Sequence, residues 1–523
     1  MITITVAFAL SASSAIIPLA SGLANSADIN TSVEDQSTDN ATGYSYPIVD
    51  TGQEYCYSDS TSIPCPEDDQ SFYGQDGQVA GNQARYQNNG DGTVTDLVTG
   101  LMWQQNPGNK MTYAQAVAGA SKFDLAGYSD WRLPTIKELY SLIDFSGTDV
   151  SRCVEEGTCT GIPFIASDYF DFEYGDTAAG ERIIDSQWAT STKYVSTTMN
   201  GNETMFGVNF ADGRIKGYGT GTMRGGSAKT FFVIYVRGST SYGVNDFVDN
   251  GDGTISDLAT GLTWMQSDSA TGLDWEGALN YCSSLDYAGI SDWRLPNAKE
   301  LHSIVEYTRS PDTTNSAAID PIFNVSSIAN EAGQSDYPAF WSSTTHTSSN
   351  GSSRAGVYIN FGRSMGNMNG NWMDVHGAGA QRAEQKSGDP SVYSTGHGPQ
   401  GDAVRIYNYA RCVTGGTSSA VLTGGETDPN SGTGSEFGRG PGPGGQVVGQ
   451  PSGNSLAGAA GGNLLSPPQE AIDACSASSV GAACSINTPQ GTLSGSCTTI
   501  QNTLACVPED GPGGQGPPQG GQP

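Results

Sequence analysis

The residues of this chain that could carry chemistry begin with a serine in a GxSxG pattern. Residues 362–366 have the sequence GRSMG, with Ser364 at the centre. A nucleophile elbow of this type requires a strand-to-helix turn and a histidine partner later in the chain. Here a Gly- and Asn-rich stretch follows, and the corresponding earlier segment, residues 213–217, has the sequence GRIKG without a serine. We therefore expect no hydrolase site at this position.

Two acidic turns and four histidines are the candidate metal ligands. The turns have the sequences NNGDG at residues 88–92 and DNGDG at residues 249–253. In the register of an EF-hand loop, position 1 would be Gln87 or Val248, and neither supplies the carboxylate that calcium requires, so we predict tight hairpin turns instead. We predict neither a metal nor a cofactor. The histidines, which lack the spacing of zinc ligands, are His302, His346, His376 and His397.

A polar cluster occurs twice around a Trp-Arg-Leu-Pro turn. Acid–base chemistry uses titratable groups of this kind, but a buried Arg–carboxylate bracket with helix capping accounts for the same residues. We therefore predict a structural role for both clusters. Their members are Asp130, Trp131, Arg132, Lys137 and Glu138 in the first, and Asp292, Trp293, Arg294, Lys299 and Glu300 in the second.

A long segment rich in Gly and Asn, between Phe361 and Val404, is the candidate binding surface. Long loops on a rigid scaffold often carry function, and exposed aromatic side chains stack on sugars and on protein partners. The alternative is that Trp372 packs beneath the loop as a core residue. The candidate ligand-binding residues are Asn371, Trp372, His376, Tyr393 and His397.

An internal repeat must position these residues. YQNNGDGTVTDLVTGLMWQ at residues 86–104 recurs as FVDNGDGTISDLATGLTWMQ at residues 247–266. AGYSDWRLPTIKEL at residues 126–139 recurs as AGISDWRLPNAKEL at residues 288–301. A repeat of about 161 residues is too long for a solenoid, whose units have about 20–50 residues, so it predicts two tandem domains. They are called copy one and copy two.

Each copy is predicted to be an α+β domain with a hairpin and two helices near its start. Thr112 in copy one and Asp274 in copy two precede apolar residues at helical spacing, which predicts an N-capped first helix. The second helix follows a Pro, and Thr135 with Glu138 has the spacing of a capping box. The later strands are expected at a Trp element, at Trp188 and Trp341, and at β-prone runs closing the copies, residues 230–237 and 403–411.

The composition argues for an exported, well-solvated protein. The 523 residues include 70 glycines, and 23 Lys and Arg stand against 54 Asp and Glu, which gives a formal net charge of −31. So few cations argue against binding to nucleic acid or another polyanion. Residues 5–20 are apolar and small residues follow, which predicts a signal peptide without the usual basic start. No other stretch is long and apolar enough to span a membrane, so we expect a secreted, cell-surface or periplasmic protein.

Ten cysteines in an exported chain predict disulfides. Cys282 and Cys412 align with Ala120 and Gly238 of copy one, and their joint absence there predicts that they are bonded to each other. Such a bridge would join the first helix of copy two to its last strand. Two local pairs are expected to staple surface loops, and the last four cysteines allow three pairings. These residues are Cys56 with Cys65, Cys153 with Cys159, and the set Cys475, Cys484, Cys497 and Cys506.

The predicted organisation has seven parts. A Gly-, Ser- and Pro-rich stretch after copy two is expected to be a disordered linker, and a small module held by two disulfides follows it. The parts are a signal peptide (1–27), a linker (28–44), copy one (45–240), copy two (241–416), the disordered linker (417–466), the four-cysteine module (467–508) and a disordered tail (509–523).

The doubled motifs also give the chain a family resemblance. The DNGDGT turn, SDWRLPxxKEL, the Trp-Ser element and the final YARC resemble the Lcl C-terminal domain family. The resemblance implies a fold like that of C-type lectins and formylglycine-generating enzymes. It also implies a binding role outside the cell, because the family is named from a collagen-like bacterial adhesin that binds sulfated glycans. The net charge argues against that ligand class, and the calcium-binding sequences of C-type lectins, such as Glu-Pro-Asn and Trp-Asn-Asp, are absent.

Two functional hypotheses follow. The first is a secreted or surface-displayed, non-enzymatic binding or adhesion protein, whose lectin-like domains recognise a glycan or a surface protein. The second is an exported enzyme that acts on polysaccharide or protein with the same scaffold. Catalytic residues repeated in both copies would favour the enzyme, and outside the structural polar cluster we find none, so we predict a binding protein.

Overall fold

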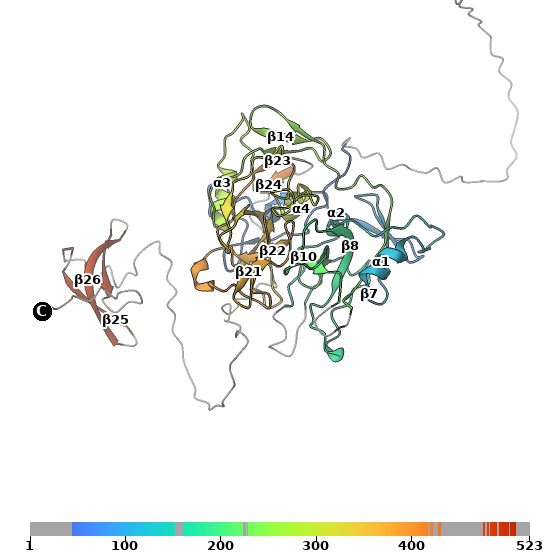
Figure 1. Cartoon of the computed structure of the whole chain (residues 1–523). Coiled ribbons are helices and arrows are strands. Elements are labelled where there is room, and N and C mark those ends of the chain that lie inside the picture. The colour runs from blue at the N-terminus through green and yellow to red at the C-terminus, as the bar shows by residue number, and fades with distance from the viewer. Residues whose placement is uncertain are drawn as a thin grey trace, which may run out of the picture. The chain divides into compact units, whose positions relative to one another are not determined.

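The computed structural model divides the chain into two compact units, residues 1–440 and residues 441–523, which are considered separately (Figure 1). The structure describes residues 44–151, 161–222, 226, 228–416, 419–421, 427–429, 474–475, 479–480, 482–488, 491–500 and 503–508. The expected signal peptide at 1–27, nearly all of the linker at 28–44, Cys153 and Cys159, and the tail at 509–523 lie outside these residues. Among the described residues, no helix has the length and apolar content needed to cross a bilayer.

Copy one has an α+β architecture of short antiparallel sheets and two short helices. Its sheets have the strand orders β12-β6-β5-β4 and β10-β9-β8, and β7 pairs with β11. The helices are α1 (Tyr113–Ala120) and α2 (Ile136–Ser141). The strands are β4 (Tyr86–Asn88), β5 (Thr93–Asp96), β6 (Met102–Gln104), β7 (Met111–Thr112), β8 (Gln187–Lys193), β9 (Thr204–Asn209), β10 (Arg214–Gly219), β11 (Thr230–Phe231) and β12 (Val236–Arg237). A 3-10 turn, η3 (Thr177–Ala179), precedes β8.

Copy two repeats this plan and adds to it. The sheet β13-β14-β15-β23 matches the first sheet of copy one, and β18-β19-β22 matches the second. The helices are α3 (Trp275–Ser283) and α4 (Ala298–Ser303). The strands are β13 (Phe247–Asp249), β14 (Thr254–Asp257), β15 (Leu262–Met265), β16 (Ile328–Ala329), β17 (Ser335–Asp336), β18 (Ala339–His346), β19 (Ala355–Asn360), β20 (Met365–Met368), β21 (Asn371–Asp374), β22 (Gln381–Gln385) and β23 (Val413–Gly415), and η4 (Pro390–Tyr393) is a 3-10 turn.

The helix starts and the hairpin turns confirm the local predictions. Thr112 and Asp274 accept backbone N–H bonds as N-caps of α1 and α3. Thr135 and Asn297 form complete capping boxes at α2 and α4. The side chain of Asp91 accepts the backbone N–H of Thr93 within the first hairpin turn. Caps and turns depend on neighbours in sequence, which is why sequence spacing is enough to find them.

The structure shifts the expected match between Trp188 and Trp341 by one residue. Ser191 N–H donates to Pro134 O and Ser343 N–H donates to Pro296 O, so β8 and β18 correspond with Ser191 matching Ser343. In this register Trp341 matches Ala189, and Trp188 matches Phe340. Successive side chains of a strand point to opposite faces, so the two tryptophans pack in different core clusters.

The closure bridge of copy two is confirmed, but its counterpart in copy one is not Gly238. Cys282 and Cys412 are bonded, and they join α3 to the residue before β23. Gln104 N–H donates to Tyr235 O where Met265 N–H donates to Cys412 O, so Tyr235 replaces Cys412. The Tyr235 hydroxyl donates to Ala116 O in α1, 2.9 Å away. A phenol thus connects helix and strand in copy one where a disulfide does so in copy two. The expected strand at residues 403–411 is absent from the described ladders, and β23 follows it instead.

A segment within the range predicted for copy one, 45–240, packs against copy two instead. Residues 51–78, called the strap, include β1 (Cys56–Tyr57), β2 (Ser62–Ile63) and η1 (Asp76–Gln78), and the predicted Cys56–Cys65 disulfide closes their first loop. The Gln53 side chain exchanges two 2.8 Å hydrogen bonds with the backbone of Thr345 in β18. Phe72 packs on Trp275 of α3, with ring centroids 6.3 Å apart. The strap therefore packs against copy two as part of its structure.

The two copies share one core. The largest buried cluster contains residues of both, and across the junction Phe206 packs on Tyr307 with centroids 4.7 Å apart. α2 and α4 lie together at the centre of the first unit, and β10 lies beside β22 (Figure 1). Tandem repeats are present as predicted, but they pack into one compact unit.

The first unit continues past the end predicted for copy two, and the four-cysteine module belongs to the second unit. β24 (Ser419–Val421) pairs with β3 (Val79–Ala80), so part of the expected linker at 417–466 joins a sheet, while most of it lies outside the described residues. In the second unit, the strands β25 (Ala483–Thr488), β26 (Gly491–Ile500) and β27 (Thr503–Pro508) form one antiparallel sheet. Of the three pairings left open, the structure has Cys475–Cys497 and Cys484–Cys506.

Candidate functional site

The candidate binding residues of copy two lie on two insertions that copy one lacks. Between the second and third strands of the sheet, copy one has residues 210–213 and copy two has residues 361–380. The first insertion contains the hairpin β20–β21. The second follows β22 and contains η4. Together with β22, these insertions are called the insertion face, and Figure 1 shows β21 and β22 close together on the orange part of the chain.

The structure brings some of the predicted residues to the surface and buries one. Asn371 is exposed and Trp372 is half-buried, both at the start of β21. Tyr393 is half-buried at the end of η4, and the His397 side chain is 38% exposed. His376 is only 1% exposed and belongs to the base of the insertion face rather than to its surface.

A largely buried ion pair joins β22 to the second insertion, and a histidine of the first insertion bonds to it. Asp402 accepts hydrogen bonds from His376 Nε2, 3.0 Å away, and from Arg382 of β22. Burial, together with the nearby Arg382 guanidinium, lowers the pKa of His376 to about 4. Although burial alone would raise the pKa of Asp402, Arg382 and His376 hold it far below its usual range. At neutral pH, therefore, the His376 ring is neutral and the Asp402 carboxylate is ionised and paired with Arg382. Such an arrangement is typical of a structural contact.

Two more side-chain bonds fasten the η4 loop to β22. His397 Nε2 lies 2.8 Å from a Glu384 carboxylate oxygen. The Gln385 amide donates to the Tyr393 hydroxyl at 2.7 Å. The Tyr393 hydroxyl and His397 Nε2 are therefore both held by β22, and the accessible parts of the two rings are what this loop offers to a ligand.

Copy one holds the hairpin in place. Tyr194 donates its hydroxyl proton to Asp374 Oδ2 at 2.8 Å, and Met199 N–H donates to the Asp374 carbonyl at 2.8 Å. The other carboxylate oxygen accepts the N–H groups of Ser364 and Gly377. Burial raises the pKa of Asp374 to about 7. The local sequence pattern of neither copy predicts this anchor, because its parts lie in different copies.

The residues of the GxSxG pattern and of the two polar clusters make structural hydrogen bonds. Ser364 follows β19 and precedes β20, so the chain around it runs from strand to strand and not from strand to helix. Its hydroxyl accepts from Asn360, and its nearest carboxylate contact is a backbone bond to Asp374. Arg132 with Glu138, and Arg294 with Glu300, form the two-bond brackets that the sequence predicts, with N–O distances of 2.5–2.6 Å.

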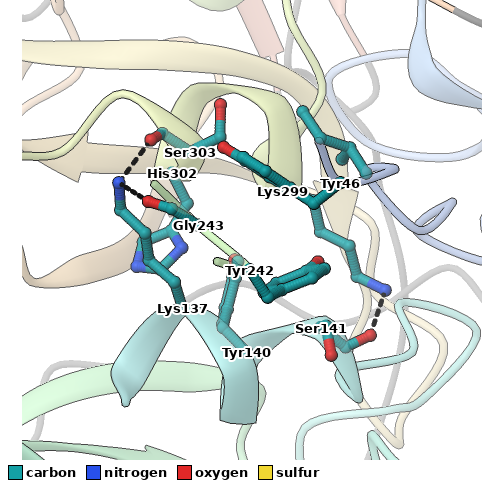
Figure 2. A pocket seen from close by; sticks show the side chains of 10 residues that line it. Tyr46, Lys137, Tyr140, Ser141, Tyr242, Gly243, Lys299, His302 and Ser303 are labelled. Atoms are coloured by element: carbon teal, nitrogen blue, oxygen red, sulfur yellow. Dashed lines mark hydrogen bonds between the residues drawn. The ribbon is translucent and has the colours of Figure 1, made fainter. Parts of the chain in front are cut away.

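The lysines of the polar clusters form hydrogen bonds from one copy to the other. Lys137 of α2 donates to Ser303 O at 2.7 Å, and Lys299 of α4 donates to Ser141 O at 2.9 Å, as Figure 2 shows. Tyr140 and His302, at equivalent positions of the two helices, pack against each other with ring centroids 4.4 Å apart and the rings tilted by 52°. The exchange of equivalent contacts gives the two copies an approximate two-fold relation.

A small cavity lies at this junction. It has a volume of about 20 Å³, which is about the size needed for one water molecule, and it is too small for a sugar or another organic ligand. The Tyr140 hydroxyl faces it (Figure 2) and has no hydrogen-bond partner among the described residues. Burial lowers the pKa of Lys137 and of Lys299 to about 8. The junction is therefore a buried polar contact, and the insertion face is the better candidate for ligand binding.

Comparison with known proteins identifies one family. The model of the Lcl C-terminal domain matches residues 92–237 and residues 253–376, one segment in each copy and together slightly more than half of the chain. The second segment ends at His376, so β22 and the η4 loop lie beyond it. No curated protein and no solved structure matches the chain.

Proposed function

This chain belongs to the Lcl C-terminal domain family, and from that premise we propose that it is a non-enzymatic binding or adhesion protein acting outside the cell. Its ligand is a glycan or a surface protein, and the insertion face of copy two recognises it. The observation that carries the proposal is that both insertions flank one strand and offer aromatic rings, while the polar groups beneath them are paired.

The chemistry of the insertion face favours a neutral glycan among such ligands. Trp372 offers a half-buried indole and the adjacent Asn371 offers an exposed amide. Aromatic faces stack on the apolar faces of sugars, and amides bond to sugar hydroxyls. The formal net charge of −31 opposes a sulfated chain.

We further propose a C-type-lectin-like fold for each copy and a location outside the cytoplasm. The bridge from the first helix to the region of the last strand, and the Arg-Leu-Pro turn before the second helix, support the fold. The four disulfides of the described residues support export, because such bonds persist in oxidising compartments.

A glycan array tests the proposal directly. The full chain should bind a set of neutral glycans, and Trp372→Ala should weaken that binding by about tenfold or more, because a stacked aromatic residue usually dominates such a contact. Tyr128→Ala is the matched control, since Tyr128 is a 38% exposed aromatic residue of copy one and its loss should leave binding unchanged.

Three outcomes would contradict the proposal. If no glycan on the array binds, a glycan is not the ligand. If Trp372→Ala and Tyr128→Ala weaken binding equally, the insertion face is not the binding site. Turnover of an array glycan by the wild-type chain would favour the polysaccharide-acting enzyme. Thermal unfolding of each variant shows whether a loss of binding is a loss of fold.

A further inference from the structure

The first helix is covered in copy two and open in copy one. Tyr113 and Trp275 are the first residues of α1 and α3, so Val117 and Leu279 occupy equivalent positions one turn later. Leu279 is 1% exposed and Val117 is 50% exposed. The strap accounts for the difference, because Phe72 packs on Trp275 and Gly74 approaches Ser283 on either side of Leu279.

The neighbouring strand shows the same asymmetry. Every residue of β18 is buried, whereas β8 leaves Ser191 and Lys193 exposed at its end. In copy two the strap bonds to this end of the strand through Gln53 and Asp76. No described residue makes the corresponding bonds in copy one.

A lysine over the first aromatic ring of the helix occurs in both copies. Lys386 Nζ lies 3.8 Å from the centre of the Trp275 ring and donates to Ser58 O of the strap at 2.9 Å. Lys193 Nζ lies 5.8 Å from the centre of the Tyr113 ring, and its carboxylate partner, Glu203, is itself 65% exposed. The strap thus covers the lysine over the first helix of copy two, whereas the lysine over the first helix of copy one, at a different position in the fold, faces solvent.

Charge indicates what would cover the open face. The strap has no Lys or Arg and contains the acidic residues Glu54, Asp59, Glu67, Asp68, Asp69 and Asp76. The open face presents Lys193, and Lys122 is exposed just after α1. In a chain with so few cations, an exposed lysine near each end of α1 favours an acidic occupant.

We propose that the open face of copy one, formed by Val117 of α1, Ser121 at the end of that helix and Lys193 of β8 around the buried Tyr113, is a docking surface for an extended acidic segment of a partner polypeptide. The segment lies across α1 as the strap lies across α3, and it places an aromatic side chain over Tyr113 and Val117, the equivalents of Trp275 and Leu279. This surface is separate from the insertion face, so the inference does not depend on the proposed function.

The strap itself supplies the probe. A fluorescein-labelled synthetic peptide of residues 51–78, closed by its Cys56–Cys65 disulfide, is titrated with the full chain while fluorescence anisotropy is measured. Binding should be saturable, and Val117→Glu and Lys193→Glu should each weaken it by about tenfold or more, because they place a like charge against the acidic peptide. Both side chains are at least half exposed, so the fold should tolerate the changes.

Two controls match these variants. Leu258→Glu places the same charge at a 54% exposed apolar residue of copy two, and Arg85→Glu reverses an exposed cation away from α1. Neither should alter binding. Absence of saturable binding, equal binding of a peptide with scrambled sequence, or equal weakening by the controls would overturn the proposal. Binding that ignores Val117→Glu would mean exchange with the strap on copy two and would overturn it as well.

Discussion

At the scale of single residues, the molecule separates groups that hold the fold from groups that remain available to a ligand. His376 and Asp402 have the identities of catalytic or metal-binding residues, but His376 is 1% exposed, the Asp402 side chain is only 14% exposed, and the two are bonded to each other. Asn371 is exposed and Trp372 is half-buried, so both have accessible surface. Burial and pairing, more than residue type, therefore decide which of the candidate side chains can meet a partner.

Asp374 leads to a prediction at this scale. Burial raises its pKa to about 7, from an ordinary value of 3.8, so the folded chain retains a proton that the unfolded chain has released. The free energy of unfolding should therefore fall as the pH rises from about 4 through about 7. Asp374→Asn removes this titration while keeping an acceptor for Ser364 and Gly377 and a polar partner for Tyr194.

The measurement is urea unfolding of the wild type and Asp374→Asn at a series of pH values. The stability of the wild type relative to the variant should decrease between pH 4 and pH 8, with the variant gaining most above pH 7. Tyr194, Asp312 and Asp336 face or influence the same carboxylate, and they are unchanged in both proteins. A difference that is constant across the range would contradict the assignment.

At the scale of elements, local signals and long-range contacts differ in how far the sequence determines them. The helix caps and hairpin turns were predictable because Thr112, Asp274 and the Asn-Gly-Asp-Gly turns bond within a few residues. The match of Trp188 with Trp341 was wrong by one residue, because a strand register depends on partners far away in sequence. The substitution of Tyr235 for Cys412 was invisible to a cysteine count, because a phenol reaching α1 shares no sequence pattern with a disulfide.

The two closures of the copies give a prediction at this scale. Cys282→Ser should cost about 4–5 kcal/mol of unfolding free energy, because the bridge closes a loop with a sequence separation of 130 residues. Tyr235→Phe removes one hydrogen bond to a buried carbonyl and should cost about 1–2 kcal/mol. Urea unfolding measures both, and a mobility change on a non-reducing gel confirms loss of the bridge. Equal costs would show that the bridge does little beyond what the phenol does.

At the scale of the whole molecule, the repeat is a pair with an approximate two-fold relation. The sequence showed two similar segments, and it could not show that they share a core, because the lysines that join them have the same local pattern whether their acceptors lie in their own copy or in the other. The strap breaks the symmetry by covering copy two alone, and the insertions break it again on copy two. Each departure matches a surface to which we assign binding: the insertions form the insertion face of copy two, and the lack of a strap leaves the open face of copy one. This is expected where a scaffold is duplicated and only the added segments differ.

The shared core predicts that the copies unfold together. Lys299 donates to Asp50 O and Ser141 O of copy one at 2.8 and 2.9 Å, so Lys299→Met leaves two buried carbonyls without their donor. A loss of about 2–3 kcal/mol is expected, because hydrogen bonds to charged groups contribute more than neutral ones. Hydrogen exchange in increasing urea, followed in peptides of each copy, should show one common transition that moves to lower urea in both copies. Lys122→Met, at an exposed lysine of copy one, should leave it in place. If Lys299→Met shifted the transition of copy two alone, the copies would be independent domains in contact, and the two-fold junction would contribute little to either.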